Sequence, residues 1–561
     1  MKIIDYYATL EKLGELHFDD RYVSGKVSTV VTDAVSLIDI DVKCRFSPYG
    51  FTHIFQNERS FVLKIDISEF SDVLGQKLYS PFWAAPVLNG LSDRMQHILL
   101  RRGDKYVFVL PISNSSVNTF INRTEKNVLE ISVNTMSHDC TEIHSPVAIS
   151  TEAESPYDAI RRGYEYAAEN RLILTALKRS KSFPDALNYL GWCTWNALGN
   201  DVCEEKIISK FAEFKEKNIP VRWLLIDDGW QETDGFYMVS PFENKEKFPH
   251  GIKHTVDILK SEYNVLYVGI WHSATGYWHG LKNECENSFK TDAGVILPDG
   301  YEFFGSWHRY LREQGIDFIK VDCQGNLVEY LKNNYAALKK VQGIQIGLEE
   351  SAHENFDFMI NCMGLNNVNT FSRTHSSVIR SSDDFYPDKP DSLRNHIEQN
   401  VYNALFYNDL FYCDFDMFCS KHLRAKQNAV LRAISGGSFC ITDELGESSC
   451  EFILPFVDES GKKIRFDNCA RPTRDCIFGY DKAIKVFNTY GQNGAVAVFA
   501  FEDETTVHLS ASDFMGDGTY KVRSVLSEQD FILRCGESFD ITLSPFDCDI
   551  FIFDKSVDTK R

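Results

Sequence analysis

The sequence contains no CxxC pair, although it carries 15 cysteines among its 561 residues. Without closely spaced thiol pairs, a zinc ribbon is not expected. The cysteines lie singly within apolar runs, as Cys44, Cys193, Cys323 and Cys440 do. Because scattered free thiols are typical of a reducing compartment, the sequence predicts a cytoplasmic location.

Long apolar runs are also lacking, and the start of the sequence does not predict a leader segment. The first 20 residues, MKIIDYYATLEKLGELHFDD, have neither an apolar core nor a small-residue cleavage site, so no signal peptide is predicted. No apolar stretch reaches the roughly 20 residues of a membrane-spanning helix, and we expect no membrane partner. Internal repeats and low-complexity tracts are missing as well.

Positive charge is in short supply. The chain has 59 Lys and Arg against 80 Asp and Glu, which gives a formal net charge of −21. A field of this sign repels phosphate backbones, so we expect no nucleic-acid partner. Hydrophobic residues make up 43% of the chain and aromatic residues 13%, which is enough for a large folded core.

The spacing of apolar residues divides the chain into four regions. Residues 1–155 alternate apolar and polar positions in short runs, which predicts an antiparallel β-sandwich. Residues 156–186 read as a helical linker that begins at Ser155-Pro156, with its helix at about 157–178. Residues 187–478 alternate short apolar runs with helical patterns, and residues 479–561 predict a small antiparallel β domain.

The third region contains eight apolar runs in order, and the predicted fold is therefore α/β with a central (β/α)₈ barrel. The runs are LNYLGWCTW, VRWLLIDD, NVLYVGIW, DFIKVD, FDFMINC, SVIRSS, LFYCDFD and SFCITDE. Helices are expected over 202–217, 253–262, 302–314, 328–340, 392–407 and 422–434. In such barrels, residues at the carboxyl ends of the strands carry the chemistry.

Acidic and aromatic residues gather where these strands end. Asp227 and Asp228 end the second strand, Asp322 ends the fourth, and Asp383 and Asp384 follow the sixth. Large rings accompany the first three strands: Trp192, Trp195, Trp230 and Trp271. Carboxylates accept sugar hydroxyls, rings stack on sugar C–H faces, and paired acids can cleave a glycosidic bond. The pattern favours a carbohydrate site.

Each of these residues also has a more ordinary interpretation. An Asp at a strand end often caps a helix, and a Trp on a strand is more often core than sugar platform. Asp414 and Asp416 could hold a cation, but few histidines accompany them, and we expect no metal there. A carbohydrate-binding protein without catalysis is the alternative from another functional class.

Six blocks of the third region resemble, in order, the raffinose synthase branch of glycoside hydrolase family 36, which is related to the α-galactosidases. They are GWCTWNAL, LLIDDGWQ, DFIKVDCQG, VIRSSDDFYP, CDFDMFCS and LRAISGGSFCITDE. The resemblance covers about residues 187–445. It implies a retaining enzyme that cleaves terminal α-linked galactose from oligosaccharides or glycoconjugates, with no metal and no organic cofactor.

The resemblance also implies roles for individual residues. Asp322, which ends IKVD, would be the nucleophile, and Lys320 and Arg380 would contact the sugar. The acid/base would be Asp383 or Asp384. Matching the SD pair of the α-galactosidases favours Asp383, which we take as the first candidate, whereas counting from the arginine, as in family 27, favours Asp384.

Further residues would shape the sugar pocket by the same resemblance. Asp227 and Asp228 would bind the axial O4 and the O6 of galactose. Cys362 and Gly364, from the CMG stretch, would lie at the 2-position. The pocket wall would be formed by Trp192, Trp195 and Trp271, and Trp230, from its place beside the second strand, is expected to help shape it.

The sequence departs from the family pattern in three respects. Asn196 follows Trp195 where family members commonly carry Asp, Cys323 stands where an aliphatic residue is more usual, and the chain is shorter than the plant synthases. A site with fewer covering loops admits water, so hydrolysis is expected to exceed transfer. Galactosyl transfer and another specificity, such as α-N-acetylgalactosaminide cleavage, are the alternatives within this fold. Related enzymes are commonly oligomers, so a homo-oligomer is expected.

Overall fold

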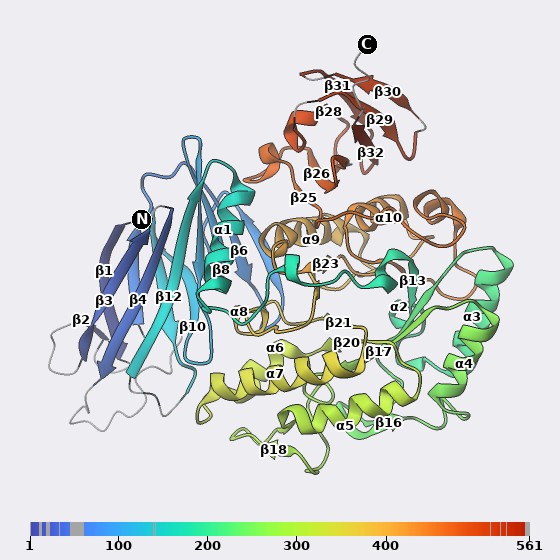
Figure 1. Cartoon of the computed structure of the whole chain (residues 1–561), viewed down its shortest axis with the longest axis horizontal. Helices are drawn as coiled ribbons and strands as arrows, with labels where there is room; N and C mark the ends of the chain where they lie inside the picture. The colour runs from blue at the N-terminus through green and yellow to red at the C-terminus, as the bar shows by residue number, and fades with distance from the viewer. Residues whose placement is uncertain are drawn as a thin grey trace.

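The structure is a computed structural model of the chain. It describes residues 2–10, 14–17, 23–32, 34–44, 61–137, 140, 142–516, 518–527, 529–534 and 536–555. Figure 1 shows three parts: an N-terminal β layer, a central region of strands and helices, and a C-terminal β unit beside it. Within these residues, no helix is long and apolar enough to cross a membrane.

The N-terminal part is a sheet of 12 strands that folds over on itself. Its strands are β1 (Lys2–Leu10), β2 (Gly14–His17), β3 (Val23–Thr32), β4 (Val35–Cys44), β5 (Phe61–Asp66), β6 (Asp72–Leu78), β7 (Ala84–Leu88), β8 (Met95–Arg102), β9 (Lys105–Pro111), β10 (Asn118–Glu125), β11 (Val128–Asn134) and β12 (Glu142–Ala153). Apolar residues from β4, β9 and β12 share one buried cluster with residues from β5, β10 and β11. A core shared by two strand layers is that of a β-sandwich, as expected.

Eight parallel strands form the central barrel. They are β13 (Leu190–Cys193), β14 (Trp223–Ile226), β17 (Tyr267–Ser273), β20 (Phe318–Asp322), β21 (Phe358–Asn361), β22 (Val378–Arg380), β23 (Tyr412–Asp414) and β24 (Phe439–Ile441). Each pairs in parallel with its sequence neighbour, and β13 also pairs with β24. A parallel bridge between Phe418 and Ile441 closes the gap between the seventh and eighth strands. All eight predicted strands are present, and the barrel fold is confirmed.

Helix α1 (Pro156–Glu169) packs on β9 and β12 of the sandwich, whereas the other helices lie between the barrel strands, and two short hairpins are inserted early in the barrel. The helices are α1 (Pro156–Glu169), α2 (Trp195–Leu198), α3 (Glu204–Glu216), α4 (Ile252–Glu262), α5 (Gly300–Glu313), α6 (Gln324–Leu331), α7 (Ala337–Asn355), α8 (Asn367–Thr370), α9 (Leu393–Tyr407) and α10 (Ala425–Ile434). The hairpins are β15 (Gln231–Asp234) with β16 (Tyr237–Glu243), and β18 (Ser288–Lys290) with β19 (Ile296–Pro298).

Two predicted helices were wrong in extent. The helix expected over 328–340 is two helices, because Asn333 and Ala336 adopt positive φ angles of 67° and 48°. The backbone N–H of Asn333 donates instead to Met136 of the N-terminal sheet. The linker helix α1 ends at Glu169 rather than near residue 178, since Arg171 also has a positive φ of 55°. Residues other than glycine rarely adopt this region, so each site ends a helix.

The barrel interior is filled by every second residue of its strands. Trp223, Leu225, Phe318 and Phe358 belong to one inner cluster, in which the last two rings stack 4.5 Å apart. Glycines make room for these rings: a Cβ on Gly191 would lie 1.9 Å from the Trp223 ring. Since side chains alternate along a strand, Asp227, Lys320 and Asp322 share the inward phase of Trp223 and Phe318.

The N-terminal sandwich is fixed to the barrel by buried amides. The Gln76 side chain donates to Asn403 of α9, and Asn403 donates to the carbonyl of Ala84. Gln96 donates to the carbonyl of Leu365 in the loop after β21. These bonds are buried, so they hold the β6–β7 loop of the sandwich against the barrel.

The C-terminal strands form a six-stranded sheet and a separate pair. They are β25 (Arg471–Pro472), β26 (Ala483–Tyr490), β27 (Asn493–Ala500), β28 (Thr505–Ser510), β29 (Tyr520–Ser524), β30 (Asp530–Leu533), β31 (Ser538–Leu543) and β32 (Cys548–Lys555). The pairings within them are antiparallel, as predicted. Helix α10 contacts β27 and β32, so this unit packs on the outside of the barrel beside α10 (Figure 1).

Candidate active site

A buried lysine joins two carboxylates at the carboxyl end of the barrel. Lys320 and Asp322 come from β20, and Asp227 follows β14. The Lys320 Nζ lies 2.9 Å from Asp227 Oδ2 and 3.6 Å from Asp322 Oδ2. Although burial opposes its charge, the two carboxylates raise the pKa of Lys320 well above its usual value. The lysine therefore stays charged and holds both acids in place.

The two carboxylate oxygens of Asp322 differ: one accepts a hydrogen bond, and the other accepts none from an N–H or O–H group among the described residues. The Trp271 indole N–H donates to Asp322 Oδ2 at 2.5 Å. Oδ1 is buried and accepts no N–H or O–H hydrogen bond within the described part of the chain. Burial raises the pKa of Asp322, while Lys320 acts in the opposite direction. An oriented carboxylate with an unpaired oxygen is suited to attack a sugar carbon.

A second ionic group lies at the ends of β22 and β23. Arg380 is buried, with its Nη1 at 2.9 Å from Asp416 and its Nη2 at 2.6 Å from Asp384. The Asp384 side chain is still 44% exposed, so it lies at the barrel mouth. Partial desolvation of its carboxyl group inside the mouth and the Asp416 carboxylate raise the pKa of Asp384, against the effect of Arg380. A carboxyl group with a raised pKa is what general-acid catalysis requires.

Asp383 points into a different environment from its neighbour. Its Oδ2 accepts from the Tyr79 hydroxyl at 2.8 Å, and its Oδ1 accepts from Tyr386 at 3.2 Å. Tyr79 belongs to the loop after β6 of the N-terminal sandwich. Asp383 thus connects the sandwich to the barrel, whereas Asp384 joins the ionic group around Arg380. The two candidates for the acid are therefore held by different partners, and which of them acts as the acid stays a prediction.

The thiol of Cys362 lies between the two ionic groups. Arg380 Nη1 is 3.9 Å from its sulfur, and the thiol also lowers the pKa of Asp322. The charge of Lys320 acts to lower the pKa of both Asp322 and Asp384, so the same lysine influences both acids. The arrangement contains a candidate nucleophile, a candidate acid and cations that orient both.

Comparison with protein families identifies the chain's relatives. A sequence model described as raffinose synthase or seed imbibition protein Sip1 matches residues 97–237, 232–299 and 289–505, which is more than half of the chain. The chain belongs to the raffinose synthase family. The matched segments include all of the candidate residues above except Tyr79.

Curated plant members of the raffinose synthase family are similar along most of this chain. A galactinol–sucrose galactosyltransferase of Pisum sativum is 24% identical over 533 residues, covering 80% of this chain and 66% of its own length. A stachyose synthase of the same species is 22% identical over 605 residues, covering 80% and 70%. Two Arabidopsis thaliana relatives are covered over 61% and 50% of their length, so the chain spans about half to two thirds of the first relatives it matches.

Solved structures show that this raffinose synthase family member has an α-galactosidase fold. A family 36 α-galactosidase of Geobacillus stearothermophilus, solved with raffinose, aligns with a TM-score of 0.60 at 10% identity and covers 98% of this chain and 89% of its own. A family 27 β-L-arabinopyranosidase of the same species aligns with a TM-score of 0.51 at 14% identity, covering 67% and 100%. At these identities the likeness concerns the fold alone.

Two of the predicted aromatic wall residues were wrong. Trp192 points out of the barrel, where its ring packs against Phe211 and Phe214 of α3. Trp230 is fully buried, and its indole N–H donates to the carbonyl of Trp271 at 2.7 Å. Trp230 thus supports Trp271 from behind and has no surface for a sugar.

The other predicted pocket residues differ in their placement. Trp195 is half-buried and packs against the inner cluster at the barrel mouth, where a wall residue is expected. Gly364 is buried, and a Cβ on it would lie 3.2 Å from both Gln324 and Arg373. A side chain at this position would therefore meet α6 and Arg373, and the place of Gly364 at the sugar 2-position stays a prediction.

Sequence reasoning missed three aromatic residues of the site. Trp278, in the loop after β17, donates its indole N–H to Asp228 Oδ2 at 2.8 Å. Trp83 of the sandwich lies with its ring 5.3 Å from the Arg380 guanidinium, and Tyr79 binds Asp383. Trp278 follows a predicted strand and could have been found. Nothing near Tyr79 or Trp83 in the sequence indicates contact with a site 300 residues away.

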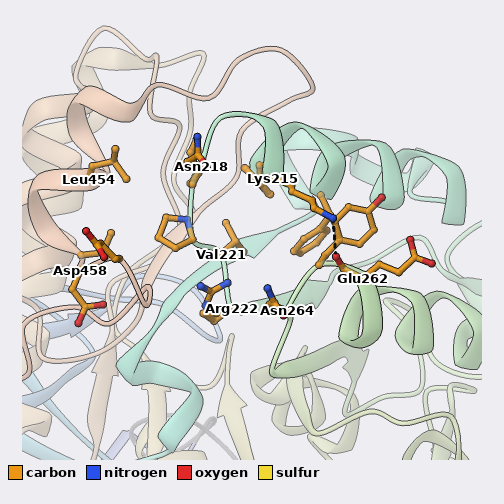
Figure 2. Close-up of a pocket in the computed structure, with 15 residues that line it drawn as sticks. Lys215, Asn218, Val221, Arg222, Glu262, Asn264, Leu454 and Asp458 are labelled. Carbon is orange, nitrogen blue, oxygen red and sulfur yellow. Dashed lines mark hydrogen bonds between the residues drawn. The ribbon is translucent and has the colours of Figure 1, made fainter.

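A pocket among the described residues lies away from this site. Its volume is about 570 Å³, and it is lined by residues such as Lys215, Arg222, Glu262 and Asp458 (Figure 2). These belong to the connections that lead from α3 to β14 and from α4 to β17, and to a later loop. They lie at the amino ends of the strands, opposite the face where barrels of this kind carry their chemistry.

Asp228→Asn is expected to stabilise the protein at neutral pH. Burial raises the pKa of Asp228 from 3.8 to about 6, despite hydrogen bonds from Trp278 and Tyr277. A raised pKa means that ionisation costs stability, so the free energy of unfolding falls as pH rises from about 4 through about 6. Asn avoids this cost, and we expect a gain of about 1–3 kcal/mol at about pH 8 that nearly disappears at about pH 4.

Urea unfolding at both pH values measures this effect, with exposed Asp257→Asn as the control that should show no gain. An equal change at both pH values would contradict the assigned pKa. If Asp228 also binds substrate, the same variant should bind sugar more weakly while being more stable.

Proposed function

We propose that the chain is a retaining enzyme that cleaves terminal α-linked galactose. The observation that carries the proposal is the buried set of Asp322, Lys320 and Asp227, together with Asp384 held by Arg380. Asp322 attacks the anomeric carbon while Asp384 protonates the leaving oxygen. Water then releases galactose with retained configuration, with Asp384 acting as the base.

The choice of galactose rests on the acids at the barrel mouth. Asp227 and Asp228 lie side by side after β14, one held by Lys320 and the other by Trp278. In this proposal they accept the O4 and O6 hydroxyls of the galactosyl group. The printed names of the plant relatives, and the raffinose bound to a structural neighbour, support α-galactosides as the substrate class.

Transfer of galactose to a second sugar is the alternative outcome at the same site. It is favoured by the names of the curated relatives, which are galactosyltransferases and a stachyose synthase. Both outcomes share the galactosyl-enzyme on Asp322 and differ only in whether water or a sugar hydroxyl attacks it.

Product analysis distinguishes these outcomes. We expect an aryl α-galactoside and raffinose to release free galactose, with no turnover of the matching α-glucoside or β-galactoside. Adding sucrose with galactinol as donor should leave most of the galactose free. A trisaccharide as the main product would replace hydrolysis by transfer, and no reaction with any donor would contradict the proposed function.

We also propose that the protein works in the cytoplasm. The described cysteines are all free thiols, and most are buried. This state fits a reducing compartment.

A further inference from the structure

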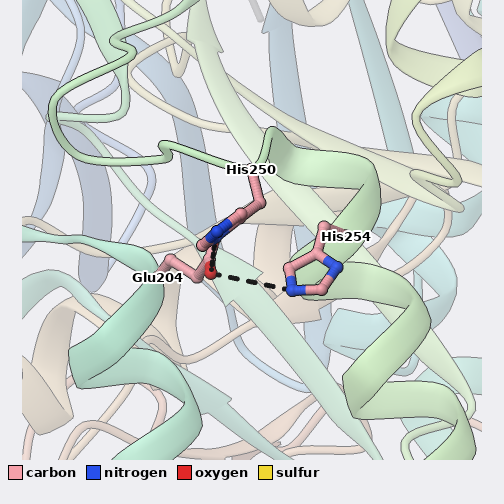
Figure 3. Close-up of side chains that lie close together, drawn as sticks. All are labelled: Glu204, His250 and His254. Atoms are coloured by element: carbon pink, nitrogen blue, oxygen red, sulfur yellow. Dashed lines mark hydrogen bonds and ion pairs between the residues drawn. The ribbon is translucent and has the colours of Figure 1, made fainter.

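We propose a metal site for a zinc-like divalent ion on the outer flank of the barrel, formed by Glu204, His250 and His254. Glu204 is the first residue of α3, His250 precedes α4, and His254 lies in the first turn of α4. Figure 3 shows both rings directed at the same Glu204 carboxylate. These are the only three such side chains that group in this way among the described residues.

The distances between the three ligand atoms suit a small ion and require little movement of the side chains. Glu204 Oε1 lies 2.8 Å from His250 Nδ1 and 3.9 Å from His254 Nε2. Ligand atoms around a tetrahedral zinc ion are about 3.4 Å apart, because each lies about 2.1 Å from the metal. The two observed distances bracket this value, and all three ligand atoms lie within 4.8 Å of one another.

The state of Glu204 is the second observation that points to a ligand. Its side chain is only 10% exposed, and its Oε2 is buried without a hydrogen-bond partner in the described part of the chain. Leaving a buried carboxylate oxygen unpaired is costly, and a bound cation would compensate for it. The histidine rings are 65% and 46% exposed, so an ion can reach the site from solvent.

The ligand set indicates the class of metal. Two imidazoles and one carboxylate suit zinc and neighbouring transition metals, whereas magnesium and calcium prefer oxygen ligands. Three protein ligands leave one position for water.

The site also lies close to the turn after β14 that contains Asp227 and Asp228. The backbone of Glu204 donates to the carbonyl of Lys247, and the Lys247 side chain donates to the carbonyl of Gly229, next to Asp228. A bound ion would fasten α3 to α4 beside this turn. The proposal does not depend on the proposed function, because the ion takes no part in the chemistry at Asp322.

Zinc titration of the untagged protein tests the site. We use a Cys285→Ser background, because Cys285 is an exposed thiol that could bind zinc itself. Competition with a chromogenic chelator should show one zinc ion bound per chain, and zinc should raise the melting temperature, since it binds the folded state. His250→Ala and His254→Ala should each weaken binding at least about tenfold, the scale of loss at metal sites.

His508→Ala is the matched control, because His508 pairs with Asp540 at 2.8 Å and belongs to no group of three metal-ligating side chains among the described residues. It should bind zinc as the parent does. His250 and His254 are exposed, so their replacement should leave the fold intact, and the melting temperature without zinc checks this. Absence of stoichiometric binding, or equal affinity in all three histidine variants, would overturn the proposal.

Discussion

Asp322→Gly is expected to lower turnover of an aryl α-galactoside by on the order of 10⁴–10⁶-fold. In the folded protein Trp271 and Lys320 hold Oδ2 of Asp322, which leaves Oδ1 for attack on the anomeric carbon. Glycine removes the nucleophile and leaves space in its place. The values of kcat and kcat/KM, compared at equal folded concentration, measure the loss.

Azide separates a nucleophile from a residue that merely maintains the site. Azide in the space left by Asp322→Gly should attack the α-galactoside directly and give β-galactosyl azide, with the aryl alcohol as leaving group. Trp192→Phe is the matched control, because Trp192 packs outside the barrel and should affect melting temperature but not turnover. Retained turnover in Asp322→Gly, or an azide product of α configuration, would remove Asp322 from the mechanism.

Much of the barrel could be predicted because its strands are short and apolar on both faces. Such runs, separated by helical patterns, specify a parallel sheet with little ambiguity. The acids at their ends could be predicted for the same reason, since strand ends meet on one face. Lys320 and Asp322 even share the inward phase of Phe318, so one correct strand placed both residues.

The phase of the first strand could not be predicted in this way. In GWC, both neighbours of Trp192 are small, and a strand buried on both faces gives no polar side to mark the outside. The structure sets the phase through the Trp223 ring, which takes the space above Gly191 and leaves Trp192 pointing outward. A contact between two strands therefore decides that Trp223, and not Trp192, faces the barrel interior.

The contribution of the sandwich lay beyond sequence reasoning for a different reason. Tyr79 and Trp83 reach Asp383 and Arg380 only because buried amides hold the β6–β7 loop against α9. No local pattern reports a contact across 300 residues. The same contacts separate the adjacent acids, since Tyr79 holds Asp383 while Arg380 holds Asp384.

Asp384→Ala is expected to lower turnover of raffinose by about 10²–10⁴-fold, the usual contribution of a general acid. The loss should be much smaller for a nitrophenyl α-galactoside, because nitrophenolate leaves without being protonated. Steady-state rates on the two substrates measure this difference. Azide should accelerate the variant and give α-galactosyl azide, since it attacks the galactosyl-enzyme on Asp322 from the face that Asp384 normally serves.

Asp383→Ala is the matched control, one residue away and of the same chemistry. Its carboxylate is held by Tyr79 and Tyr386, so its loss should loosen the β6–β7 loop and depress both substrates alike, without azide acceleration. If the dependence on leaving group and the azide product instead follow Asp383, then the acid is the residue that faces the sandwich. Tyr79 would in that case tune its protonation directly, and the N-terminal domain would be part of the catalytic site.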